Sequence, residues 1–256
     1  MSDKKKDAGV VAGEESVDTR ERILYAAKRE FAENGFNGAR MGAISRRANA
    51  NQALIHYYFG NKENLYMVVL QRLFGVDDTD MVQEFLSRWT FTPPEGLYMA
   101  IYILVNVHRE AFDPDFMKII AREIADGKSN FTTLLNDFLL PRLALLEEVI
   151  HEGIKTGDFE TRNPLLAVYN LVMLVMNYES DRDHFKGSSW YDRLYGKNGD
   201  KEFFLFVLEH TFKGLCPRGK EAEIPVIDRE ILEKLDELIR KIKDSHKWVM
   251  EDMDEE

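Results

Sequence analysis

The sequence has little of what secreted, membrane-spanning or disulfide-stabilised proteins need. Its 256 residues include one cysteine, Cys216, which excludes an intramolecular disulfide and any metal site with several cysteine ligands. The longest apolar stretch, residues 165–176, is interrupted by Asn170 and is too short to cross a bilayer. The opening residues, MSDKKKDAGV, have no apolar segment behind their lysines. We therefore expect no secretory signal and a cytoplasmic location.

Strand patterns and catalytic motifs are also missing. No run of alternating apolar and polar residues is bounded by hairpin turns. The sequence contains no Gly-rich phosphate loop, no His-Glu-x-x-His helix and no motif that frames a nucleophilic serine. Histidines beside carboxylates, such as His151 near Glu147, are more often surface or core residues than metal ligands. We therefore expect no enzyme, no bound metal and no cofactor.

The charge is unevenly distributed. The whole chain carries a formal net charge of −11, but residues 18–75 hold nine basic and five acidic residues. A basic first quarter on an acidic remainder is compatible with a nucleic-acid partner, because the local field matters more than the total charge. A small basic excess is also common on an ordinary solvated surface, so the charge alone decides nothing.

Helical signals occupy almost the whole chain, which predicts an all-α fold. The segment from Asp18, with Glu21 in capping-box spacing, carries a stripe of apolar residues and stops at Gly35. Two short helices are expected at residues 41–48 and 52–59, followed by a fourth that Asn61 caps. Longer helices follow, and residues 225–250 predict an additional C-terminal helix with an apolar stripe.

The two short helices have helix-turn-helix spacing. Asn49 can adopt the positive φ that the turn requires, and Asn51 can cap the second helix. On a helical wheel, Ala53, His56 and Tyr57 lie opposite the apolar side of this second helix. Such an exposed face suits entry into a DNA groove, where Gln52 could bond adenine and Ala53 could meet a thymine methyl. The candidate DNA-binding residues are Arg40, Met41, Arg46, Arg47, Asn51, Gln52, Ala53, Leu54, His56, Tyr57 and Lys62.

The stretch ILYAAKREFAENGFNGARMGAISRRANANQALIHYYFGNKENLY resembles the DNA-binding domain of the TetR-type (TetR/AcrR) transcriptional regulators. The shared features are Gly35-Phe36 after the first helix, the aromatic run Tyr57-Tyr58-Phe59 and the pair Lys62-Glu63. The chain departs from the family pattern at Ser45 and Asn49, and at Arg40-Met41, where a hydroxyl usually contacts phosphate.

The resemblance implies three parts: a disordered tail (1–17), a helix-turn-helix DNA-binding domain (18–75) and a helical ligand-binding and dimerisation domain (76–256). It implies a homodimer on an inverted-repeat operator of double-stranded DNA, most simply a ligand-released repressor associated with the nucleoid. Residues 165–176 and 203–212 are apolar around most of a helix, which independently favours dimerisation; burial within one monomer is the alternative. The candidate dimerisation residues are Leu166, Tyr169, Val172, Met173, Met176, Phe203, Phe206 and Val207.

The family also implies a small, mostly apolar effector held among the middle helices. Aromatic and Met side chains with a few polar tips are the usual lining of such sites. The candidates are Trp89, Tyr98, Tyr102, His108, Phe112, Phe116, Met117 and His151. Two alternatives stay open: a DNA-binding protein of the same fold with a chromosome-organising or division role, and a helical small-molecule-binding protein without a specific DNA target.

Overall fold

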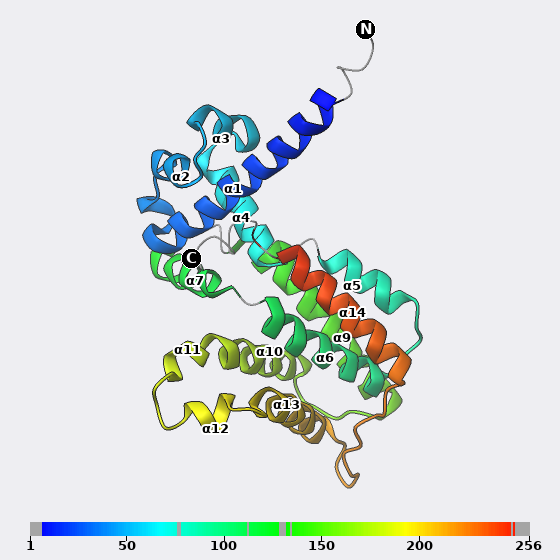
Figure 1. The fold of residues 1–256 in the computed structure, drawn as a ribbon. Helices are drawn as coiled ribbons and strands as arrows, with labels where there is room; N and C mark the ends of the chain where they lie inside the picture. Colours follow the sequence, from blue (N-terminus) through cyan, green and yellow to red (C-terminus); the bar gives the residue numbers. More distant parts are fainter. Residues whose placement is uncertain are drawn as a thin grey trace. The chain divides into compact units, whose positions relative to one another are not determined.

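The residues that the computed structural model describes form helices and connecting turns, with no β-strand among them (Figure 1). The described backbone comprises residues 7–75, 78–111, 113–127, 132–133, 135–246 and 248, and the described side chains begin at Thr19 and omit those at 110, 111, 138 and 246. The predicted all-α fold is confirmed. No helix in the described ranges is both long and apolar enough to cross a membrane.

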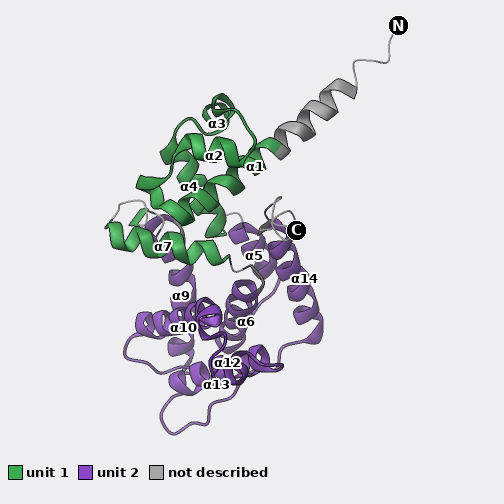
Figure 2. Cartoon of the chain, turned by 60° about the vertical axis from the view of Figure 1, so that its left-hand side comes forward, with its two compact units in different colours: residues 1–77, 113–134, 246–256 green, residues 78–112, 135–245 purple. Residues whose placement is uncertain are grey.

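Contacts divide the chain into two units, shown in green and purple in Figure 2. The first comprises residues 1–77, 113–134 and 246–256, and the second residues 78–112 and 135–245. The helices of the first unit are α1 (Asp7–Gly38), α2 (Met41–Arg47), α3 (Gln52–Phe59), α4 (Lys62–Leu73) and α7 (Pro114–Asp126). The second unit contains α5 (Asp78–Ser87), α6 (Pro93–Ala111), a π-helical turn (Leu135–Leu139), α9 (Leu140–Thr156), α10 (Pro164–Ser180), α11 (Arg182–Phe185), α12 (Tyr191–Tyr195), α13 (Gly199–Leu215) and α14 (Arg229–His246). The contacts thus group α7 with the N-terminal helices, although the predicted boundary lay at residue 75.

Helix α1 begins at Asp7 and not at the predicted cap Asp18, so residues 7–17 of the predicted tail are helical and residues 1–6 lie outside the described chain. Residues 7–17 contain no proline, so nothing in their covalent structure interrupts the helical hydrogen bonds. The regular helix stops at Gly35, as predicted, because this residue has φ +66° and ψ 173°.

An aromatic cluster inside the first unit joins α1 to α4. Phe31 meets Tyr66 edge to face at 4.7 Å between ring centroids, and Phe36 lies 5.0 Å from Tyr66. Helix α7 is fastened to α1 by ion pairs from Lys28 to Asp113 (2.7 Å) and from Arg29 to Asp115 (3.0 Å). These contacts make α1, α4 and α7 one framework around the short helices α2 and α3.

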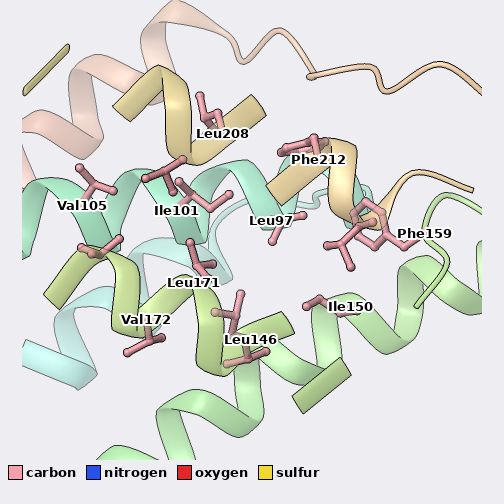
Figure 3. Close-up of a cluster of buried hydrophobic side chains, with 14 residues drawn as sticks. Leu97, Ile101, Val105, Leu146, Ile150, Phe159, Leu171, Val172, Leu208 and Phe212 are labelled. Carbon is pink, nitrogen blue, oxygen red and sulfur yellow. The ribbon is translucent and has the colours of Figure 1, made fainter. Parts of the chain in front are cut away.

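Figure 3 shows the core of the second unit, in which α6, α9, α10 and α13 converge. The buried residues of this core are Leu97, Ile101, Val105, Leu146, Ile150, Phe159, Val168, Leu171, Val172, Val175, Val207, Leu208, Phe212 and Leu215. A second cluster lies where α14 packs on α5 and α6, with Leu235, Leu238 and Ile242 buried. The predicted C-terminal helix is present and packs on the second unit itself, although its described part spans Arg229–His246 and so begins later than residue 225.

Candidate DNA-binding interface

The turn between α2 and α3 has the predicted geometry. Asn49 has φ +46° and is the one non-glycine residue of positive φ in the described backbone. The Ser45 hydroxyl donates a 2.6 Å hydrogen bond to the Ala50 carbonyl and closes the turn. Asn51 caps α3 by accepting a 2.9 Å hydrogen bond from the Ala53 N–H, as predicted. The departures from the family pattern at Ser45 and Asn49 therefore support the turn locally.

Helix α3 separates a buried side from an exposed side. Ile55 is fully buried and Phe59 is 6% exposed, whereas Tyr57 is 80% exposed. Gln52, Ala53, Leu54 and His56 are also exposed. The predicted orientation of His56 and Tyr57 away from the core is confirmed. Gln52, Ala53, Leu54, His56 and Tyr57 together form the exposed α3 face.

Two contacts order side chains of the exposed α3 face. His56 Nδ1 lies 2.7 Å from the carbonyl oxygen of Gly60, at the C-terminal end of α3. A carbonyl only accepts, so Nδ1 carries the proton in this bond and Nε2 is the ring nitrogen left for an outside partner. The Gln52 amide lies over Gly42 of α2, where an added Cβ would stand 2.9 Å from Nε2. A side chain at position 42 would therefore displace Gln52.

Several other candidates already have intramolecular partners. Arg47 donates two hydrogen bonds to the Glu33 carboxylate, of 2.9 and 2.7 Å. These bonds stabilise the charged carboxylate and lower the pKa of Glu33. The Lys62 ammonium donates a 2.6 Å bond to the Ala39 carbonyl and lies over the Phe36 ring at 4.8 Å. Asn51 is used in its cap. Arg40 and Arg46 are exposed, and Met41 is half-buried. Lys62 thus supports the entry to α2 from within the protein.

Sequence reasoning missed two residues of this interface. Arg20 of α1, with 44% of its side chain exposed, places its guanidinium 5.5 Å from the centroid of the Phe59 ring at the end of α3. Its position in a basic segment was the available signal, but its distance in sequence from residue 59 hid the contact. Gly42 was missed because its role is to leave space for the Gln52 side chain, and hydrophobic periodicity does not report such space.

The described effector candidates belong to both units. Trp89, Tyr98 and Tyr102 pack at the cluster of α5, α6 and α14, where the Tyr102 hydroxyl donates a 2.7 Å bond to Asp236 of α14. Burial, followed by this bond, raises the pKa of Tyr102. Phe116 and Met117 belong to the first unit, on α7, and Phe112 lies outside the described residues.

The two candidate histidines of the second unit differ in environment. His108 lies inside the unit, and burial lowers its pKa to about 4 despite a hydrogen bond with the Met176 backbone. His151 is 52% exposed, with Nε2 3.6 Å from a Glu147 oxygen. Within the described residues, no three His, Cys, Asp or Glu side chains are arranged to hold a metal ion.

The dimerisation candidates fall into three groups: exposed, buried and partly buried. Leu166, Tyr169 and Phe206 are 61%, 55% and 55% exposed. Val172 and Val207 are buried in the monomer's own core, while the remaining three pack partly against it: Met173, Met176 and Phe203. Val172 and Val207 therefore cannot meet a second copy without a rearrangement of the core. Local apolar periodicity could not distinguish these buried residues from the exposed ones.

The known proteins that this chain resembles are bacterial transcriptional regulators. The family model for "Bacterial regulatory proteins, tetR family" matches residues 23–68. The HTH-type transcriptional repressor NicS of Pseudomonas putida is 24% identical over 211 residues, 80% of this chain and 96% of NicS. The repressor SCO4008 of Streptomyces coelicolor is 46% identical over 54 residues, 21% of this chain and 28% of SCO4008. The crystal structure of the Bacillus subtilis regulator FadR with stearoyl-CoA shares the fold at a TM-score of 0.53 and 20% identity, covering 76% of this chain and 98% of FadR.

Proposed function

We propose that this chain is a sequence-specific DNA-binding transcriptional regulator, because its residues 23–68 match the model of the tetR family of bacterial regulatory proteins and its relative NicS is a transcriptional repressor. The observation that carries the proposal is the exposed α3 face, on which Tyr57 is 80% exposed beside Gln52 and His56. A tyrosine hydroxyl can contact a phosphate, and a helix with such an exposed face can enter the major groove. Gln52 and Ala53 read bases, and Tyr57, Arg40 and Arg46 contact phosphates.

The protein acts as a homodimer. Leu165, Leu166 and Tyr169 of α10 are exposed, as are Leu205 and Phe206 of α13. Apolar side chains of this size on adjacent helices mark an association surface more often than free solvent contact. A two-fold axis presents two α3 helices to half-sites about 34–36 Å apart on an inverted repeat.

The test is selection of random duplex DNA by the purified protein at two salt concentrations. We expect an inverted repeat with half-sites about one helical turn apart. Tyr57→Phe should weaken binding to all sequences and leave the salt dependence unchanged, since the lost phosphate contact is made by an uncharged hydroxyl that releases no counterion. The matched control is Tyr191→Phe on α12. No enriched motif, with weak binding that only fades with salt, would contradict a sequence-specific regulator.

Regulation by release from DNA is the second part of the proposal. NicS and SCO4008 are named repressors, and FadR was crystallised with an acyl-CoA. The present chain is a cytoplasmic, nucleoid-associated repressor whose effector is small and mostly apolar. Such a ligand lowers DNA affinity only if it binds the DNA-incompetent state more tightly.

The effector site of the second unit is best sought around Tyr98 and Tyr102, which both meet Phe204 edge to face at 6.1 and 5.4 Å. Thermal-shift screening of apolar molecules, including long-chain acyl-CoA, tests this assignment. A hit should raise the melting temperature of the wild type and dissociate its operator complex. Tyr102→Ala should reduce both effects, whereas His151→Ala, at an exposed site, should retain them. A hit that acts equally on both variants would place the effector elsewhere.

A further inference from the structure

Trp248, beyond the last helix, is a buried part of the first unit. Its residue is 5% exposed and its ring lies 6.3 Å from that of Tyr25. The helix that precedes it, α14, belongs to the second unit by its contacts. The C-terminal segment therefore contributes a large aromatic side chain to the unit that carries α2 and α3.

Two cations from different helices face this indole. Lys28 Nζ of α1 lies 4.7 Å from the Trp248 ring centroid, and the Arg72 guanidinium carbon of α4 lies 4.3 Å from it. Both distances are well inside the range of cation–π attraction, which is strongest over tryptophan and stronger when the cation is desolvated. Each cation also pairs with a carboxylate: Lys28 with Asp113 and Arg72 with Glu21.

Helices α1 and α4 both contact α3, as α2 also does. Helix α4 follows α3 after only Gly60 and Asn61. At this same C-terminal end of α3, Arg20 of α1 lies over the Phe59 ring. A change in the placement of α1 against α4 would therefore move the exposed α3 face, although no residue on that face would change.

We infer that Trp248 is a positioning residue for DNA reading: it joins α1 to α4 through Lys28 and Arg72 and so holds α3 in its DNA-binding orientation. The inference rests on the proposed DNA-binding function. It assigns a role to the C-terminal segment that neither the α2–α3 motif nor the dimer surface provides. The contact depends on the π face of the indole, so an aliphatic side chain at position 248 should not take over this role.

A pair of truncations separates Trp248 from the acidic residues 251–256 of the sequence. A chain of residues 1–250 keeps the tryptophan, and a chain of residues 1–246 loses it. Affinity for the selected operator should be equal for the full chain and 1–250, and about fivefold to tenfold lower for 1–246. The inference would be overturned if the 1–246 chain bound the operator as tightly as the 1–250 chain, whether or not both bound more weakly than the full chain.

Point variants of the full chain distinguish positioning from simple packing. Trp248→Leu should lower operator affinity, and Trp248→Phe should restore much of it, at temperatures where both are fully folded. Trp190→Leu, at a tryptophan that is 55% exposed, is the matched control and should bind as the wild type. If Trp248→Leu and Trp248→Phe bind equally well, the cation–π contact has no role.

Amide hydrogen exchange of residues 52–59 gives a readout that needs no DNA. Trp248→Leu should speed exchange in α3 several-fold relative to wild type, with Trp248→Phe in between. Unchanged exchange in α3 would refute the inference even if DNA binding is confirmed. If Trp248→Leu exchanges faster in α3 but the wild type binds no specific DNA, the positioning contact is supported and the proposed function is rejected.

Discussion

The Tyr66 hydroxyl of α4 donates a 2.7 Å hydrogen bond to Oε1 of Glu123 on α7, and both side chains are buried. Burial, followed by this bond, raises the pKa of Tyr66, so the phenol stays protonated as the donor. The second carboxyl oxygen of Glu123 is buried and finds no partner among the described residues. The hydrogen bond from Tyr66 thus partly compensates the cost of burying the Glu123 carboxyl group. The same bond links α7 to α4, the helix that follows α3.

Tyr66→Phe should lower the free energy of unfolding by about 2–3 kcal/mol, because a buried carboxyl group loses its donor. Urea denaturation at neutral pH measures this. Glu123→Gln keeps an acceptor for the phenol and should cost less. An unchanged urea midpoint for Tyr66→Phe would show that solvent reaches Glu123.

Gly42→Ala should change base preference without loss of stability. The added Cβ would stand 2.9 Å from the Gln52 amide nitrogen, so this flexible side chain must move. Repeated DNA selection should relax the same half-site position as Gln52→Ala does. Gly214→Ala, where a Cβ meets nothing within 4 Å, is the control. A selected motif identical to that of the wild type would remove Gln52 from base reading.

His108 should make the protein less stable in mild acid. Its pKa is lowered to about 4 in the folded chain from 6.5, so between these pH values the unfolded chain binds a proton that the folded chain does not. The free energy of unfolding is therefore unaffected by His108 above about pH 6.5. As the pH falls from there towards 4, protonation of His108 in the unfolded chain lowers it by up to about 1.4 kcal/mol per pH unit. Denaturation of wild type and His108→Gln at pH 7.5, 6 and 5 measures the difference. Parallel pH profiles would argue against a buried neutral histidine.

Phe206→Glu should convert the proposed dimer into monomers. The residue is 55% exposed, so the monomer should fold, but a symmetric interface would bring the two new charges together. Sedimentation velocity at micromolar protein measures the mass. Val226→Glu, at a residue 94% exposed in the loop before α14, should stay dimeric. A dimeric Phe206→Glu protein would move the interface away from α13.

Lys62→Ala should act on stability more than on DNA affinity. Its ammonium donates to the Ala39 carbonyl and lies over Phe36, so its loss leaves a partly buried acceptor without its donor. We expect about 1–2 kcal/mol less stability. The salt dependence of DNA binding should stay that of the wild type, in contrast to Arg46→Ala, which removes an exposed cation proposed to contact phosphate. A flatter salt dependence for Lys62→Ala would restore the phosphate contact that its sequence position suggested.

The sequence by itself determined the helical class, the short motif at residues 41–59 and the exposed side of α3. These features follow from local chemistry: Gly35 and Asn49 accept positive φ, Asn51 and Asn61 accept backbone hydrogen bonds, and periodicity separates Ile55 from Tyr57. Each depends on residues within one or two turns, so it can be read without knowing the fold.

Tertiary structure alone decided which candidates are available for binding. Lys62 turned inward to Ala39, Val172 and Val207 entered the monomer's core, and Trp248 joined α1 and α4. Local sequence cannot predict these outcomes, because a lysine, a valine or a tryptophan has the same local pattern whether its partner is solvent, its own core or another molecule. The partner is chosen by contacts between segments distant in sequence, and these exist only once the helices have packed.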